Sequence, residues 1–209
     1  MFSPHPDDVV YSAFSTITNT PNNKVVVTVF SVSRFTKWGL GSPKLVSALR
    51  KLEDRLVFTL LGVRSYYLDE PDTSILESKL FRVRPLVKIV SIYSPLGVGL
   101  HPNHVATRKI AFHLWYSLGR RPKLVLYEDL PYAARVGSYW ELVERLAKEV
   151  GRLRMRYIPL RDDQLKLKLL FSRLYLTQTN VTDELRRRAA ENGLCCGFRY
   201  AERFFDVEP

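Results

Sequence analysis

Short apolar runs alternate along the chain with longer amphipathic segments. Residues 24–33, 87–95 and 122–129 are rich in β-branched and other apolar side chains, a composition that predicts buried strands. Residues 42–62 and 104–119 have helical spacing, and both segments end next to a glycine, which often follows a helix. Further helices are expected over residues 138–151, 162–176 and 181–192, an alternating edge strand over 152–160, and a last short strand within 196–209.

This alternation predicts an α/β fold. We expect a Rossmann-like three-layer sandwich, with a mostly parallel central sheet and helices on both faces. The 209 residues suit a single domain over 1–209. Only Met1 to Ser3 precede the first polar loop, so the first strand is expected to be very short. Parallel sheets place their sites at the carboxyl ends of strands, where we look for chemistry.

Two histidine-containing loops follow predicted strands. The first, "SPHPDD", contains His5 and Asp8, and the second, "SPLGVGLHPNH", ends at His104. Two histidines and one carboxylate are the ligands of a catalytic zinc site with an open position. The neighbouring Asp7 would remain free to accept a proton from water, and His101 could face the same water from the other side. His113 falls mid-helix and is expected to serve packing.

Each of these features also has a purely structural interpretation. Asp7 or Asp8 could cap a helix, because "PHPDD" resembles a helix-initiating turn. Histidines three residues apart also occur on the surface at helix starts. Only four histidines occur in the chain, however, and three of them fall in the loops at predicted strand ends. This concentration favours a metal site.

Composition limits the classes of partner that the protein can have. The net charge is +11, with arginine clusters near residues 120, 154 and 187. A basic balance fits nucleic acid, an anionic membrane, an anionic small substrate, or simply a solvated surface. No helix-turn-helix signature stands out, which argues against nucleic acid as a partner. No apolar run is long enough for a membrane span. Two adjacent cysteines give no disulfide framework, and no signal peptide is visible, which predicts a cytoplasmic protein.

The order of motifs resembles the PIG-L/LmbE family of zinc-dependent N-acetylglucosaminyl de-N-acetylases. The similarity rests on "SPHPDD", the later H-x-x-H, "RKLEDRLVFTLLGV" (50–63), "YLDEPD" (67–72), "YEDLPYA" (127–133) and "ERFF" (202–205). It spans nearly the whole chain. The resemblance implies a hydrolase that removes the acetyl group from an N-acetylglucosamine-type sugar or conjugate and releases acetate.

The resemblance also implies roles for individual residues. His5, Asp8 and His104 would hold Zn²⁺, although this ligand set accepts other divalent metals. Asp7 would act as general base, and His101 as general acid or oxyanion-stabilising residue. The two positions expected to contact substrate are Arg50 and Asp72. Arg50 could instead form an ion pair with Glu53, and Asp72 could be a turn residue after Pro71. Glu128 and Asp129 could line the pocket or cap a helix.

The sequence departs from the family pattern in three respects, one of which is the short start before the first loop, expected to weaken the sheet beneath the site. The family usually has Asp where this chain has Asn103, and that carboxylate orients a histidine, so we expect His101 to titrate at lower pH. After HPDD, the family often continues with Glu and small residues, whereas this chain has "VVYSAF". Two alternatives therefore stay open: a weak or inactive family member, or a basic nucleic-acid-binding α/β domain. A homo-oligomer is also possible, and the charge suggests an anionic sugar substrate.

Overall fold

The computed structural model describes residues 1–19, 24–72 and 89–208. A first, fully parallel sheet has the strand order β1 (Phe2–Ser3), β2 (Val25–Val32), β5 (Arg64–Pro71). The expected short first strand is confirmed, because β1 contains only two residues. The segment Arg64–Pro71 was not expected to be a strand. Its residues are exposed or half-buried and include Asp69, Glu70 and a proline, so it lacks the apolar run that marked β2.

A second sheet of four strands is mixed. Its order is β6 (Ser91–Pro95), β7 (Lys123–Tyr127), β9 (Ala201–Glu208), β8 (Arg152–Pro159). β6 and β7 are parallel, whereas β9 is antiparallel to both of its neighbours. These strands confirm the sequence predictions, except that residues 87 and 88 lie outside the described part of the chain. β8 is the edge strand that was expected, and the last strand lies inside the sheet with nearly all of its side chains buried.

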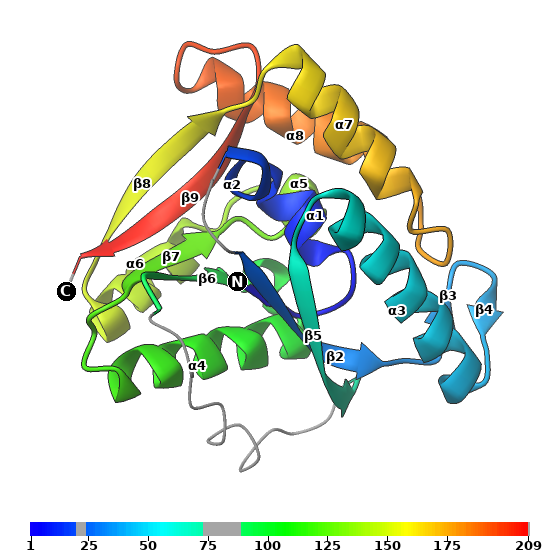
Figure 1. Ribbon diagram of the computed structural model, residues 1–209. Helices are drawn as coiled ribbons and strands as arrows, with labels where there is room; N and C mark the ends of the chain where they lie inside the picture. Colours follow the sequence, from blue (N-terminus) through cyan, green and yellow to red (C-terminus); the bar gives the residue numbers. More distant parts are fainter. Residues whose placement is uncertain (20–23, 73–88, 209) are drawn as a thin grey trace.

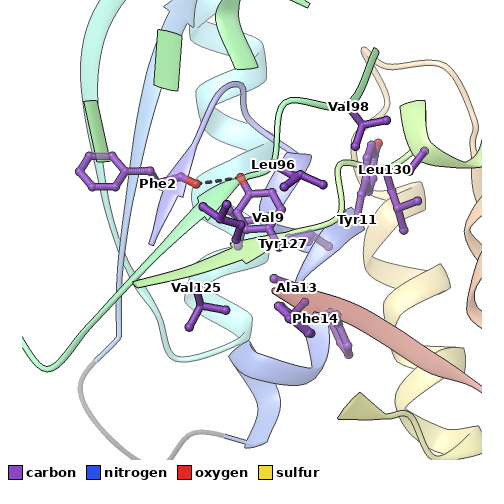
Figure 2. Packing of buried hydrophobic residues seen from close by; sticks show 14 of the residues in the cluster. Phe2, Val9, Tyr11, Ala13, Phe14, Leu96, Val98, Val125, Tyr127 and Leu130 are labelled. Atoms are coloured by element: carbon purple, nitrogen blue, oxygen red, sulfur yellow. Dashed lines mark hydrogen bonds between the residues drawn. The ribbon is translucent and has the colours of Figure 1, made fainter. Parts of the chain in front are cut away.

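The two sheets meet where β1 lies beside β6. The hydroxyl of Tyr127 donates a hydrogen bond of 2.8 Å to the carbonyl oxygen of Phe2, and this bond links β7 to β1 (Figure 2). Val9, Phe14 and Val125 belong to the buried apolar cluster around this bond. The loop that carries His5, Asp7 and Asp8 is therefore joined directly to the buried apolar core.

Helices cover both sides of the sheets, which confirms the three-layer prediction. Figure 1 shows α4 on one side and α1, α2, α7 and α8 on the other. The remaining elements include α3, which packs against β2 and β5, and α6, which packs against β8. The helices are α1 (Asp8–Ser12), α2 (Phe14–Asn19), α3 (Pro43–Leu60), α4 (Pro102–Ser117), α5 (Tyr132–Arg135), α6 (Trp140–Val150), α7 (Asp162–Arg173) and α8 (Thr182–Leu194), with a small hairpin β3 (Phe35–Thr36) and β4 (Gly39–Leu40).

None of the helices within the described residues is both long enough and apolar enough to cross a bilayer.

Candidate metal centre

The loop between β1 and α1 brings His5 and Asp8 together. The backbone N–H of Phe30 donates to the carbonyl oxygen of Pro4 at 2.8 Å, which fixes the loop against β2. One carboxylate oxygen of Asp8, Oδ2, accepts a hydrogen bond of 2.8 Å from the backbone N–H of His5. The same oxygen lies 3.1 Å from Nδ1 of the His5 ring. The three-residue spacing of the motif thus sets the ring and the carboxylate side by side.

His104 reaches the same carboxylate from the first turn of α4. Its Nε2 lies 3.5 Å from Oδ2 of Asp8, and its Nδ1 lies 2.6 Å from Oδ1 of Asp129. The side chain is fully buried, and Nε2 has no hydrogen-bond partner among the described residues. Nδ1 donates to Asp129, so Nε2 is the ring nitrogen that faces the carboxylate of Asp8. Although burial opposes protonation, Asp8 and Asp129 raise the pKa of His104, so this position favours a cation: a proton on Nε2, or a metal ion bound by Nε2 and Asp8 in its place.

The donor set fits a divalent metal ion. His5, Asp8 and His104 each offer one ligand atom, and these atoms lie within 4.8 Å of one another. This is the two-histidine, one-carboxylate set that the sequence predicted, and zinc, iron, cobalt or manganese all accept it. Although burial opposes ionisation, the neighbouring His104 and His5 hold the pKa of Asp8 below its usual range. The carboxylate is therefore available as an anionic ligand.

Asp7 lies beside the donor set in a strained backbone conformation. Its φ is +107°, a region that non-glycine residues rarely occupy and that is found most often at functional sites. It takes the position preceding α1, but its side chain makes no capping hydrogen bond, so helix capping does not account for it. Burial and the adjacent Asp8 carboxylate raise the pKa of Asp7 well above its usual range. Such a carboxylate binds protons readily.

His101 completes a cluster of three imidazoles. Its ring centroid lies 5.4 Å from that of His5 and 5.4 Å from that of His104. Nδ1 of His101 accepts a hydrogen bond of 3.3 Å from the backbone N–H of Asn103, which places the proton of the neutral ring on Nε2. Burial and the neighbouring histidines lower the pKa of His101. The neutral ring is therefore the favoured form near pH 7.

The side chain of Asn103 contacts a different histidine from the one we expected. Its amide nitrogen lies 2.8 Å from Nε2 of His5, the ring nitrogen that faces away from Asp8, and its backbone N–H donates to Nδ1 of His101. The lower pKa of His101 is confirmed in direction, but its causes are burial and the neighbouring imidazoles. Asp72 also lies nearby, with Oδ1 3.6 Å from Nε2 of His5. Asp72 and Asn103 thus both lie beside Nε2 of His5, on the side of the ring away from Asp8.

Arg50 lies on the inner side of α3, where its charge acts on Asp7 and His5. Its guanidinium group is buried, and Nε has no hydrogen-bond partner in the described part of the chain. No ion pair joins it to Glu53, although both residues are described, because Glu53 accepts hydrogen bonds from the backbone N–H and hydroxyl of Thr177 at 2.8 and 2.6 Å. The structural alternative for Arg50 is therefore wrong.

Two further residues belong to the site: Asp129, for which the sequence left open either lining the pocket or capping a helix, and Tyr132, which the sequence did not indicate. Asp129 holds His104 with one oxygen, and its other oxygen accepts the backbone N–H groups of Gly97 and Val98 at 2.7 and 3.0 Å. Tyr132 packs its ring 4.9 Å from that of His104. Both come from the "EDLPYA" loop after β7, so their position at a strand end was the available signal. Glu128, in contrast, points away and binds Arg188 at 2.6 Å, along with Asn192.

Comparison with known families identifies the chain. The sequence profile of the PIG-L family, described as GlcNAc-PI de-N-acetylase, matches residues 1–115. The chain belongs to the PIG-L family. The matched segment contains all three residues of the donor set, together with Asp7, Arg50, Asp72 and His101. A search of curated proteins finds no significant match.

Solved structures share the fold of this PIG-L family chain across nearly its whole length. A zinc-inhibited form of teicoplanin deacetylase superposes with a TM-score of 0.75 at 19% identity, covering 99% of this chain and 96% of that one. The N,N'-diacetylchitobiose deacetylase from Pyrococcus horikoshii gives 0.73 at 20% identity, covering 99% and 82%. The hydratase GalB from Pseudomonas putida gives 0.70 at 16% identity, covering 100% and 95%. Since a hydratase shares the fold, the fold alone does not determine the reaction.

Proposed function

We propose that this protein is a metal-dependent hydrolase that removes the acetyl group from an N-acetylglucosamine-type sugar or its conjugate and releases acetate. The observation that carries the proposal is the buried Nε2 of His104, which has no hydrogen-bond partner among the described residues and faces the carboxylate of Asp8 within the set His5, Asp8 and His104. Membership of the PIG-L family supports the reaction class. The catalytic unit would be one domain over residues 1–209.

Zn²⁺ is the metal we propose, bound by His5, Asp8 and His104. A divalent ion at this place would supply Lewis acidity, which polarises an acetamide carbonyl and makes water more acidic. Proton transfer, stabilisation of the developing negative charge and substrate binding would come from side chains of the protein. Nδ1 of His104 stays attached to Asp129, which keeps Nε2 pointing into the site.

Asp7 is the proposed general base. Its burial beside Asp8 raises its pKa, and this makes it a better proton acceptor than an ordinary aspartate. In amide hydrolysis it would take one proton from water as the water oxygen attacks the acetyl carbon. The same proton would then pass to the nitrogen of the leaving amino sugar, so that acetate and a free amine result.

His101 is the proposed donor to the carbonyl oxygen as negative charge develops there. Because its Nδ1 accepts the Asn103 N–H, the neutral ring carries its proton on Nε2 and can donate from that atom. The lowered pKa supports a neutral donor rather than an imidazolium ion. Such a hydrogen bond is worth roughly 3 kcal/mol of transition-state stabilisation.

Arg50 and Asp72 are the proposed substrate contacts. The buried guanidinium of Arg50 has a donor, Nε, without a hydrogen-bond partner among the described residues, and a sugar hydroxyl or a substrate anion would satisfy it. Asp72 lies at the end of β5 with its side chain partly exposed, which suits a contact to a sugar hydroxyl. The net charge of +11 supports an anionic substrate, such as a phosphorylated sugar conjugate.

The test is a deacetylation screen that measures acetate release from neutral and phosphorylated N-acetylglucosamine derivatives. Protein stripped with a chelator would be reloaded with zinc, cobalt, manganese or iron. We expect turnover only with metal, a loss of at least about 100-fold in Asp7→Asn, and loss of both metal and turnover in His104→Ala. His113→Ala, on the same helix, is the matched control and should keep both.

The possible outcomes separate the alternatives. No acetate release from any substrate with any metal would leave an inactive family member, and so would equal rates for wild type and Asp7→Asn. A preference for anionic substrates that disappears at high salt would support the charge argument, and equal rates on neutral and anionic substrates would end it. We also propose a cytoplasmic location, because Cys195 and Cys196 are unpaired thiols.

A further inference from the structure

The helix α3 has an apolar outer face as well as a buried inner face. Its inner face contributes Val46, Val57 and Phe58 to the interior. Its outer face carries five exposed leucines, whose exposed fractions are 61% for Leu45, 40% for Leu49, 64% for Leu52, 50% for Leu56 and 60% for Leu60. A helix at the surface of a monomer normally presents polar side chains on this side. Figure 1 shows the backbone of α3 at the periphery of the molecule, and the exposed fractions of the leucines place this face toward solvent.

The leucines form a continuous stripe. Successive members are separated by four, three, four and four residues. At 3.6 residues per turn, these five positions fall within an arc of about 80° on the helix surface. Steps of three and four residues are the spacing of a coiled-coil seam, in which one helix packs against another. The stripe therefore has the form of a helix-packing surface.

The spacing is also nearly the same when it is read backward. If a second α3 lies antiparallel to the first, Leu45 meets Leu60, Leu49 meets Leu56, and Leu52 lies next to its own copy. A twofold axis near residue 52 therefore matches every leucine with a leucine, as a symmetric interface between identical chains requires. We infer that α3 is a dimer interface, in which the leucine stripe Leu45–Leu60 packs antiparallel against the same stripe of a second copy.

The area of the stripe is sufficient for a dimer of modest affinity. Five leucines that are 40% to 64% exposed present apolar surface on the order of 500 Å². Covering this surface on both chains removes about 1,000 Å² from water, near the lower limit for a specific interface. Ala48 and Thr59 are also exposed along the edge of the stripe and extend the contact.

The charges beside the stripe give the dimer a characteristic salt dependence. Lys44 and Arg55 are exposed along one edge. In an antiparallel pair the twofold axis brings the same edge of both helices to the same side, so these cations repel each other across the contact. Salt screens this repulsion, so the dimer should strengthen as salt rises. Binding of the same face to an anionic membrane would weaken with salt.

The first experiment measures mass in solution by sedimentation between 1 and about 100 μM, in low and high salt. We expect a species of twice the 24.2 kDa chain mass whose fraction increases with salt. Leu52→Glu should shift dissociation at least about tenfold toward the monomer, because it places two carboxylates together at the axis. Leu194→Glu is the matched control, since Leu194 is 83% exposed on α8, and it should leave the dimer intact.

The second experiment tests the antiparallel register with cysteines, in a Cys195→Ser, Cys196→Ser background. Leu52→Cys should form an intermolecular disulfide readily. Leu45→Cys alone should not, because an antiparallel pair holds the two copies of residue 45 about 22 Å apart, but Leu45→Cys with Leu60→Cys should. Circular dichroism would confirm that each variant folds.

Three outcomes would overturn the inference. One is a wild-type protein that remains monomeric at every concentration and salt. Another is rapid cross-linking of Leu45→Cys to itself, which would indicate a parallel pair. The third is a monomer that binds vesicles of phosphatidylglycerol and phosphatidylcholine at low salt and loses that binding in Leu52→Glu, which would assign the stripe to a lipid surface. None of these readouts depends on deacetylase activity.

Discussion

Two buried polar clusters in this protein differ in how many of their polar atoms have hydrogen-bond partners. Around Glu202, both carboxylate oxygens are occupied: one accepts from the backbone N–H of Phe14 at 3.0 Å and from the ammonium of Lys168 at 2.6 Å. The other accepts from the backbone N–H and the hydroxyl of Ser15 at 2.8 and 2.5 Å. This cluster fixes the start of α2 to β9 and α7.

The cluster around the candidate metal centre leaves several atoms without partners. Nε2 of His104, Nε of Arg50 and the hydroxyl of Tyr11 are buried without a hydrogen-bond partner among the described residues. Each such atom costs about 1–3 kcal/mol relative to a satisfied one. Buried polar groups therefore serve two purposes in this protein: the Glu202 cluster stabilises the fold, and the candidate metal centre keeps binding capacity at the expense of stability.

The largest expected effect is at the Glu202 cluster. Lys168→Met removes the cation and leaves Glu202 as an unpaired buried charge, so the free energy of unfolding should fall by about 3–5 kcal/mol. Urea denaturation measures this loss. Lys166→Met on the exposed side of α7 should change stability by less than about 0.5 kcal/mol. If Lys168→Met were as stable as Lys166→Met, the Glu202 cluster would not stabilise the fold.

Asp54 is an intermediate case, since it is buried and is held by the hydroxyls of Tyr175 and Tyr67 at 2.9 and 3.1 Å. Burial raises the pKa of Asp54 to about 7. The folded protein then binds this proton more tightly than the unfolded chain does, so the stabilisation is full below about pH 4 and is lost as pH rises through about 7. The loss amounts to at most about 4 kcal/mol.

The test of this prediction compares wild type with Asp54→Asn by urea denaturation from pH 4.5 to 7.5. As pH rises, the unfolding free energy of wild type should fall relative to that of Asp54→Asn, because the variant has no proton to lose at this position. Parallel curves for the two proteins would show that Asp54 titrates normally.

Asn103→Asp should strengthen metal binding by about tenfold. The added carboxylate would accept the N–H of His5 Nε2 and make the ring a more basic ligand, and partners of this kind typically change metal affinity by about 10–100-fold. Competition with a zinc-binding dye measures the affinity without any substrate. Asn103→Leu, of similar size, should weaken it. Equal affinities in the Asp and Leu variants would mean that residue 103 does not orient His5.

The smallest effect concerns the adjacent pair Asp7 and Asp8 in metal-free protein at pH 8. The pKa of Asp7 is raised, so its ionisation opposes folding, and Asp7→Asn should stabilise the protein by about 1 kcal/mol. The pKa of Asp8 is lowered, so Asp8→Asn should destabilise it. Thermal unfolding in the presence of a chelator measures both changes. Equal losses in the two variants would show that Asp7 stabilises the fold like any paired carboxylate.

Local patterns were sufficient to predict much of this site. His5, Asp8 and His104 were predicted as one set because each follows a strand end in an apolar, alternating sequence, and the geometry brings them together. Contacts between distant side chains could not be predicted in this way. That Asn103 contacts His5 and that Asp129 holds His104 depends on the packing of α4 against β6 and β1, which no local pattern encodes.

The strands, too, were predictable only where a local pattern of apolar residues marked them. β2 and β7 were predictable because both faces are covered and their side chains are apolar. β5 was missed because its residues are exposed or half-buried, so it has the composition of a loop. The position of β9 between β7 and β8 is a matter of strand order, and strand order depends on the whole chain.

The carboxylate of Asp129 joins two parts of the protein with different tasks. One oxygen fixes a ligand of the candidate metal centre, and the other fixes the peptide groups at Gly97 and Val98. A compound that displaced this backbone would free one oxygen of the carboxylate that orients His104. If that changed the affinity of the site for a metal ion, thermodynamic reciprocity would make the ion change the affinity for the compound by the same factor.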